Sequence, residues 1–238
     1  PLLCVVLYGV LIVTGQRYFK DRKPWNWRGT MALWNLLLST FSAVGFLRTF
    51  PMLVHLLVNY SIEELFCISA DKMYGNGSTG LWMQLFCLSK IPELLDTFFI
   101  VIHKKPLIFL HWYHHISVLL YCWHSYVTRT PPGIIFCVMN YGVHAVMYFY
   151  YFLMAVKCKP KAFKALYITI FQISQMVVGV VVTATGSYVL WVKQVDPCWL
   201  SDDNNVAALI MYGSYLFLFL DFFFQRYKMK SSKHQKME

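Results

Sequence analysis

Charged residues are scarce in this chain of 238 residues, in which Asp, Glu, Lys and Arg together make up 13%. Soluble globular domains contain about 25% charged residues, so a soluble enzyme of ordinary composition is excluded. Hydrophobic residues make up 58% of the chain and aromatic residues 18%, and the mean hydropathy is +0.50. The composition therefore predicts an integral membrane protein.

Little chain is left for a soluble domain, because seven mainly apolar windows cover most of the sequence. Each window is near the length that crosses a hydrocarbon core about 30 Å thick. The windows lack the alternation of membrane β-barrel strands, so helices are expected. The fold class expected is an all-α polytopic membrane protein with seven transmembrane helices in one integral membrane domain, residues 1–238. The windows cover residues 2–16, 29–58, 81–102, 107–127, 133–156, 166–192 and 206–225.

Acidic residues are few, 11 against 21 basic ones, which gives a formal net charge of +10. Sixteen of the basic residues lie in alternate connections, within 17–28, 104–105 and 157–164, and in a tail at 226–238. The other three connections hold only Lys72, Arg129 and Lys193. The positive-inside rule therefore predicts an N-terminus outside and a basic cytosolic tail. No cleavable signal peptide is visible, and residues 2–16 are expected to be a first span whose N-terminal end is missing or processed.

Ionisable residues inside the apolar windows are candidates for function, since a bilayer makes them costly to bury. In the third window, Lys90, Glu93, Asp96 and Thr97 fall within an arc of about 120° on a regular helix, so they are expected to face one interior. The alternative is an ion-paired face that only stabilises helix packing.

Three histidines form an HxxHH pattern in the fourth window. His111, His114 and His115 share one helix face. A dinuclear iron site would need a second histidine box, which the remaining histidines do not form, and no Cys or carboxylate spacing supports zinc. We therefore expect no metal, and packing alone explains three histidines on one face poorly.

Two further windows carry polar stripes. The fifth has Asn140, His144, Tyr148 and Tyr151 at spacings of four, four and three, and the sixth has Gln172 and Gln175. Either stripe alone fits hydrogen bonding between helices. Together with the first two clusters, the stripes predict a polar chamber that contains imidazoles, a lysine and carboxylates. Such a chamber suits acid/base chemistry or an imidazole nucleophile.

These residues resemble the four ordered motifs of the very-long-chain fatty acid elongases, the ELO family. The motifs stand here as Lys90-Ile-Pro-Glu93-Leu-Leu-Asp96-Thr97, Phe109-Leu-His111-Trp-Tyr-His114-His115, Met139-Asn140-Tyr-Gly-Val-His144-Ala-Val-Met147-Tyr148-Phe-Tyr-Tyr151 and Gln172-Ile-Ser-Gln175. The resemblance covers nearly the whole chain. Pro106 stands five residues before His111, where the polyunsaturated branch has Gln, so the chain is more similar to the branch that acts on saturated and monounsaturated acyl chains.

The resemblance implies a 3-ketoacyl-CoA synthase, an acyltransferase of the endoplasmic reticulum membrane that condenses a long-chain acyl-CoA with malonyl-CoA and releases carbon dioxide and CoA. No cofactor is expected. Spans two to seven are expected to form a ring around an acyl-chain tunnel, and basic connections, among them Lys104 and Lys105, to bind the phosphates of CoA. Asn140, Tyr148, Tyr151, Gln172 and Gln175 are candidates for substrate binding. The implied partners are the reductases and the dehydratase of the elongation cycle; oligomerisation is left open, and no nucleic acid is expected.

His114 is the candidate nucleophile, which would attack the acyl thioester to give an acyl-imidazole, with His111, His115 and His144 orienting it and moving the proton. The alternative is direct condensation, in which a histidine serves only as base. Lys90 is a candidate for stabilising a developing oxyanion, and Glu93 and Asp96 for holding imidazole tautomers, with a structural ion network as the alternative.

A disulfide is expected on the non-cytosolic side. Of the seven cysteines, only Cys67 and Cys198 lie in connections assigned to that side, which is oxidising in the endoplasmic reticulum. Two unpaired loop thiols are the alternative. The same side is expected to carry any glycan, with Asn76 as the better acceptor because Asn59 lies close to the membrane edge.

A seven-span receptor or transporter without catalytic activity is the competing class. A receptor would carry an acidic-Arg-aromatic triplet at the inner end of the third span and an Asn-Pro motif in the seventh, and the sequence has neither. A seven-span sugar transporter would show two similar three-span halves, which are also missing.

Overall fold

The computed structural model describes residues 1–228, and this part of the chain contains helices and connections but no β-strand. Residues 229–238, most of the basic tail expected at 226–238, lie outside the described residues. The helices are α1 (Leu2–Phe19), α2 (Arg28–Asn59), α3 (Ile62–Cys67), α4 (Ala70–Met73), α5 (Gly77–Ser89), α6 (Leu95–Ile102), α7 (Phe109–Val127), α8 (Gly133–Ala155), α9 (Ala165–Tyr188) and α10 (Asp202–Phe223). A 3-10 turn, Pro92–Leu94, joins α5 to α6.

Five helices within residues 1–228 are long and apolar enough to cross a membrane, which makes the chain a multi-pass membrane protein. They are α1, α2, α8, α9 with its extension to Lys193, and α10 with its extension to Tyr227. The windows at 81–102 and 107–127 are not among the five, so seven spans stay a prediction. In the second of these windows, α7 has 19 residues but carries histidines and tyrosines that lower its hydropathy.

The window at 81–102 is not one regular helix, and the expectation that Lys90 to Thr97 follow a single helical arc is wrong. Helix α5 ends at Ser89, and α6 begins at Leu95. Pro92 lies in the interruption, where it has no N–H to donate and its ring would clash with the carbonyl four residues earlier. Lys90 lies before this turn, as the C-cap of α5, and Asp96 lies after it, in α6.

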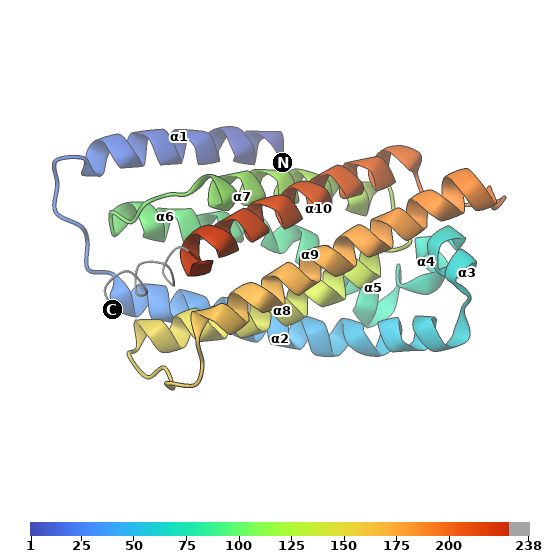
Figure 1. Ribbon diagram of the computed structural model, residues 1–238, viewed down its shortest axis with the longest axis horizontal. Helices are drawn as coiled ribbons and strands as arrows, with labels where there is room; N and C mark the ends of the chain where they lie inside the picture. Colours follow the sequence, from blue (N-terminus) through green and yellow to red (C-terminus); the bar gives the residue numbers. More distant parts are fainter. Residues whose placement is uncertain (229–238) are drawn as a thin grey trace.

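Six segments close a ring, and α1 lies outside it (Figure 1). In order around the ring, α2 packs on α8, α8 on α9, α9 on α10, α10 on α7, α7 on α5, and α5 again on α2. The most extensive packing is that of α2 against α8, followed by α9 against α10. Helix α1 packs mainly against α6 and exposes most of its apolar side chains.

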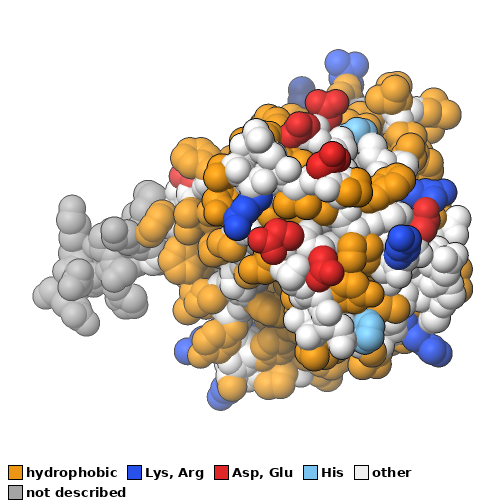
Figure 2. Space-filling view, turned by 90° about the vertical axis from the view of Figure 1, so that its right-hand side faces the viewer, with side chains coloured by type: hydrophobic (Ala, Val, Ile, Leu, Met, Phe, Trp, Pro, Cys, Tyr) orange, Lys and Arg blue, Asp and Glu red, His pale blue; other side chains and the backbone are white. Residues whose placement is uncertain are grey.

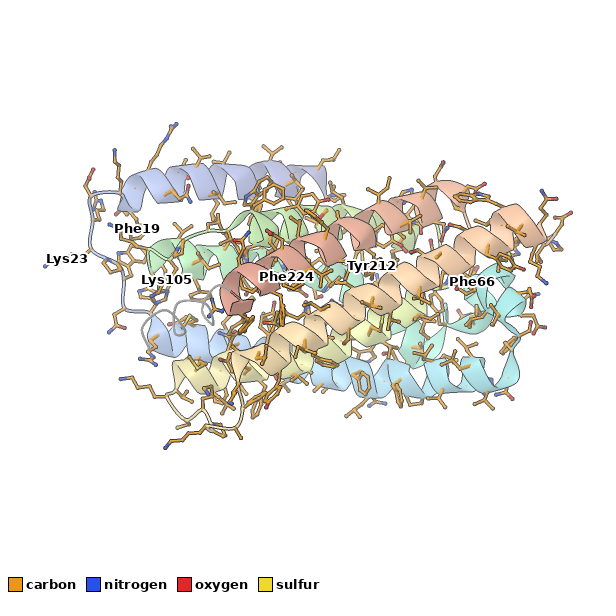
Figure 3. The ribbon with its side chains drawn as sticks, viewed as in Figure 1. Phe19, Lys23, Phe66, Lys105, Tyr212 and Phe224 are labelled. Carbon is orange, nitrogen blue, oxygen red and sulfur yellow. A yellow bond between two sulfur atoms is a disulfide. The ribbon has the colours of Figure 1, made fainter. Side chains whose placement is uncertain are left out.

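Glycines bring the ring helices into close contact. A Cβ at Gly45 of α2 would lie 2.5 Å from the ring of Tyr141 on α8, and a Cβ at Gly179 of α9 would lie 2.3 Å from the ring of Tyr212 on α10. Small residues are typical of such interfaces between membrane helices, because they let the backbones approach closely. Tyr212 lies between α9 and α10 in Figure 3.

The basic connections share one end of the molecule, which we call the basic end. Lys23 and Lys105 mark this end in Figure 3, and Phe66 marks the other. The Lys104 Nζ donates to the carbonyl oxygens of Lys20 (2.9 Å) and Arg22 (3.1 Å), and Arg28 donates to the carbonyls of Ala155 and Met154. The connections that the positive-inside rule assigned to one side therefore lie together.

The opposite end, which we call the disulfide end, carries α3, α4 and the α9–α10 connection. Cys67 and Cys198 form a disulfide here, with the two sulfur atoms 2.02 Å apart, and this is the pair expected from the topology. Figure 2 looks onto this end, where acidic and basic side chains lie among hydrophobic ones. Asn76, the candidate glycan acceptor, is exposed, and its Nδ2 donates to the carbonyl of Asp71 over 3.2 Å.

Candidate active site

A buried polar network joins the α5–α6 turn to α8. The Lys90 Nζ donates to Glu93 Oε1 at 2.8 Å and to Asn140 Oδ1 at 2.9 Å. Asn140 Nδ2 lies 3.1 Å from His144 Nε2, and Glu93 Oε2 lies 3.8 Å from His144 Nδ1. The side chains of Lys90 and Glu93 are 1% and 4% exposed, so their charges are compensated inside the protein rather than by water.

Asp96 belongs to a different set of contacts from the one expected. Its Oδ1 accepts a hydrogen bond from Trp34 Nε1 (2.8 Å), and its Oδ2 accepts one from the Tyr148 hydroxyl (2.6 Å). Asp96 therefore links α2, α6 and α8 and holds no imidazole among the described residues. The residue of α6 that does contact a histidine is Thr97, whose Oγ1 lies 2.9 Å from His111 Nε2.

The three histidines of the HxxHH pattern pack against one another on α7. Ring centroids are 4.5 Å apart for His111 and His115, and 5.4 Å apart for His114 and His115. The ring of Tyr215, from α10, lies 5.1 Å from that of His114, and its hydroxyl donates to the His114 carbonyl (3.2 Å) and bonds Ser117 Oγ (2.7 Å). Tyr215 thus holds this turn of α7 against α10.

A cavity of about 330 Å³ lies inside the ring, and His114 lines it. His111, His115 and His144 do not line this cavity. Within residues 1–228 the imidazole of His114 has no hydrogen-bond partner, whereas His111 and His144 each have one. Asn140 of α8 and Gln175 of α9 also line the cavity, and both are buried in the protein.

The cavity runs from His114 toward the disulfide end. Its walls include apolar and aromatic side chains from α7, α8 and α10, and its far end reaches the ion pair of Arg129 Nη1 with Asp71 Oδ2, at 2.5 Å. Lining residues along the walls include Val118, Cys122, Phe136, Met176, Met211 and Tyr212.

The sequence matches the model of one protein family over residues 1–235, described as ELO: GNS1/SUR4 family. The chain belongs to this family. It is 42% identical over 235 residues to very long chain fatty acid elongase 6 of Homo sapiens, which covers 98% of this chain and 86% of the relative. It is 41% identical over 221 residues to the Drosophila melanogaster protein of the same description, covering 93% of this chain and 70% of the relative.

A third relative matches the chain to a similar extent. Fatty acid elongase 3 of Trypanosoma brucei brucei (strain 927/4 GUTat10.1) is 38% identical over 255 residues, covering 95% of this chain and 83% of the relative. The chain is therefore an enzyme, an acyltransferase of the fatty acid elongase class.

The remaining candidate residues of the elongase lie away from the histidines. Gln172 Nε2 donates to Met147 Sδ at 3.1 Å, and Tyr151 is 45% exposed with its ring against Tyr150. Lys104 and Lys105 are both exposed at the basic end, and the Lys104 ammonium is already bound to backbone carbonyls.

Three aromatic residues that no motif indicated lie next to the predicted site residues. Trp34 and Tyr215 contact the predicted site residues directly, and Tyr8 reaches Thr97 from α1. Aromatic residues are ordinary in apolar spans, so no signal in the sequence distinguishes these three from their neighbours.

Proposed function

We propose that this elongase condenses a long-chain saturated or monounsaturated acyl-CoA with malonyl-CoA, through an acyl group carried on His114. One observation carries the proposal: His114 is the histidine of the HxxHH pattern that lines the cavity, and its ring has no hydrogen-bond partner within residues 1–228. A neutral imidazole in that state is a competent nucleophile toward a thioester. Pro106, which stands where the polyunsaturated branch has Gln, supports the choice of acyl group.

The reaction is written in two half-reactions. The His114 nitrogen attacks the acyl carbonyl carbon, the carbon–sulfur bond breaks, and CoA leaves as the thiol with the imidazole proton. Malonyl-CoA then loses carbon dioxide, and the electron pair of the broken carbon–carbon bond attacks the acyl carbonyl carbon. The carbon–nitrogen bond breaks, which releases 3-ketoacyl-CoA, and the leaving nitrogen takes one proton from water, which restores the neutral imidazole. No cofactor is needed, because decarboxylation supplies the carbanion.

The neighbouring side chains have separate roles in this proposal. The amides of Asn140 and Gln175 line the cavity with His114 and are suited to bind a thioester oxygen as negative charge develops. Lys90 does not line the cavity and acts through Asn140, whose carbonyl oxygen accepts from its ammonium. Glu93 stands next to His144 and is suited to fix the tautomer of that imidazole.

The cavity is proposed to hold the acyl tail. On α7, His114 and Val127 both line it, and 13 residues at 1.5 Å per residue separate them by roughly 20 Å. That length and the apolar walls suit an extended acyl chain whose thioester lies at His114. The phosphates of CoA are proposed to bind at the basic end, where exposed Lys105 is one candidate.

The elongase is proposed to span the membrane of the endoplasmic reticulum seven times. The shared end of the basic connections supports a cytosolic basic end and C-terminus, and the disulfide supports an oxidising environment at the other end. The product would pass to a reductase and a dehydratase of the same cycle. Treatment with an endoglycosidase tests the orientation: a mobility shift that disappears in Asn76→Gln supports it, and glycosylation of an acceptor sequence introduced into the connection at 157–164 contradicts it.

The nucleophile is tested with acyl-CoA alone. Purified elongase incubated with palmitoyl-CoA is expected to release up to one CoA per chain and to carry an acyl adduct on the peptide that contains His114. His114→Ala should abolish the adduct, the CoA release and condensation. The matched control is His55→Ala, which changes an exposed histidine of α2. Normal condensation by an enzyme that never shows the adduct would favour direct condensation.

A further inference from the structure

A hydrogen-bonded chain runs from α1, outside the ring, to the histidine cluster. The Tyr8 hydroxyl lies 2.7 Å from Thr97 Oγ1, and Thr97 Oγ1 lies 2.9 Å from His111 Nε2. Tyr8 is 3% exposed and Thr97 is 0% exposed, whereas most of α1 is exposed. Of the 18 residues of α1, only Tyr8 and Phe19 are buried.

The direction of this chain follows from the supply of protons. Thr97 has one hydroxyl proton and can accept two hydrogen bonds, so it accepts from Tyr8 and donates to His111, accepts from His111 and donates to Tyr8, or accepts from both. In the second case the Tyr8 proton has no acceptor within residues 1–228, and in the third the Thr97 proton has none, because Tyr8 and His111 are the hydrogen-bond partners of Thr97 Oγ1 there. A buried hydroxyl left without its acceptor is unfavourable, and the first direction therefore prevails.

The first direction sets the tautomer of His111. A hydrogen bond from the Thr97 hydroxyl makes Nε2 of His111 an acceptor, so the neutral ring carries its proton on Nδ1. The same ring packs 4.5 Å from His115, which packs against His114, and the Tyr8 ring itself lies 6.3 Å from that of His115. The Tyr8 hydroxyl is therefore linked to His111 through Thr97, and the Tyr8 ring lies near His115.

We propose that Tyr8 is a positioning residue for the elongase reaction: through Thr97 it fixes the tautomer and orientation of His111 beside the nucleophile. This inference rests on the proposed role of the histidines. The proposed role of Tyr8 gives α1, which is no part of the ring, an indirect effect on the chemical step, through Thr97 and His111. Tyr8 touches no reacting atom, so its effect belongs to kcat and not to substrate binding.

The test begins with Tyr8→Phe, which keeps the ring against His115 and removes only the hydroxyl. Loss of a single hydrogen bond predicts a fall in kcat of about tenfold, with KM for palmitoyl-CoA and malonyl-CoA within about twofold of the parent. Thr97→Val should give a similar fall, and the double variant should be no slower than the slower single variant. Tyr18→Phe is the matched control, an exposed tyrosine of α1 whose hydroxyl has no hydrogen-bond partner within residues 1–228.

A second readout separates positioning from a loss of stability. The ¹⁵N NMR signals of labelled histidines report which ring nitrogen carries the proton, and His111→Asn assigns the His111 signals. Tyr8→Phe should reduce the Nδ1-protonated population of His111 while the unfolding midpoint stays close to that of Tyr18→Phe. An unchanged tautomer, or additive losses of kcat in the double variant, would overturn the inference.

The outcomes also separate this inference from the proposed function. An active His114→Ala would end the proposed function whatever Tyr8→Phe does. An inactive His114→Ala together with a fully active Tyr8→Phe would end only the assignment of Tyr8.

Discussion

The two ends of the helix ring are cross-linked by different kinds of interaction. At the disulfide end, Cys67 and Cys198 are covalently joined, and Asn204, which is 0% exposed, bonds Thr130 Oγ1 at 2.8 Å and His124 Nδ1 at 2.9 Å. At the basic end, the connections are held by exposed side chains such as Lys104 that donate to backbone carbonyls. The disulfide end thus has a covalent cross-link and buried side-chain hydrogen bonds between its elements, whereas the basic end combines exposed side-chain hydrogen bonds with a small buried cluster around Ile102.

This difference matches the two parts of an acyl-CoA substrate. In the proposed function the acyl tail occupies the cavity, and buried Asn204 accepts a hydrogen bond from the cavity-lining Tyr121. The phosphates of CoA need exposed cations, which the basic end supplies at Lys104 and Lys105. The proposed function therefore assigns the disulfide end to the tail and the basic end to CoA.

The largest effect is expected from removing the disulfide. The bond joins residues separated by 131 positions, so the double variant Cys67→Ala/Cys198→Ala should lower the free energy of unfolding by about 4 kcal/mol. Equilibrium unfolding in mixed micelles measures it. The matched control is Cys4→Ala/Cys158→Ala, which changes two free cysteines and should have little effect. A loss below about 1 kcal/mol would mean that the other contacts already fix the disulfide end.

Much of this architecture could be predicted from the sequence, because membrane helices must be apolar, long and bounded by charged connections. The window at 133–156 begins where α8 begins and ends one residue after it, and the window at 206–225 begins four residues after the start of α10 and ends two residues after its end. The interruption at Pro92 could also have been expected, because proline removes a helical hydrogen bond. The pairing of Cys67 with Cys198 was predictable because only these two cysteines lie in the connections between windows at the disulfide end.

The details of the site could not be predicted, because they depend on packing between helices far apart in the sequence. The spacing of HxxHH gives three histidines on one face, but the position of the cavity selects His114 among them. Asp96 stands in the same motif as Lys90 and Glu93, yet the turn at Pro92 directs it to Trp34 and Tyr148. The periodicity of a single helix cannot show which histidine lines the cavity or which side chains contact Asp96.

A smaller effect is expected at the basic end, and it concerns binding rather than folding. Lys105→Gln removes an exposed charge, so the free energy of unfolding should change by less than about 0.5 kcal/mol. If Lys105 contacts the phosphates of CoA, KM for acyl-CoA should rise about threefold at low salt, and the difference should shrink at high salt. Lys72→Gln, an exposed lysine at the disulfide end, should leave KM unchanged. Equal effects of both variants would remove the distinction between the two ends.

The smallest effect is expected from an exposed contact at the disulfide end. Ser61 and Glu64 form a capping box at the start of α3: the Ser61 backbone N–H donates to Glu64 Oε2 at 2.8 Å, and the Glu64 N–H donates to Ser61 Oγ at 3.3 Å. Hydrogen bonds from Ser61 to the Glu64 carboxylate, above all the one from its backbone N–H, lower the pKa of the exposed Glu64 below its ordinary value of 4.5. A lowered pKa in the folded state means that the cap stabilises α3 fully above the unfolded pKa. That stabilisation is lost as the pH falls through the folded pKa.

Hydrogen exchange of the α3 amides measures this cap, after correction for the intrinsic pH dependence of exchange. Protection in the parent should decrease between pH 6 and pH 3, whereas Glu64→Gln should be less protected at pH 6 and nearly independent of pH. Because the cap is exposed and local, the amides of the buried ring helices should exchange alike in both proteins. The same pH dependence in Glu64→Gln would assign the titration to another group. A change spreading into α10 would mean that the disulfide end depends on exposed contacts as the basic end does.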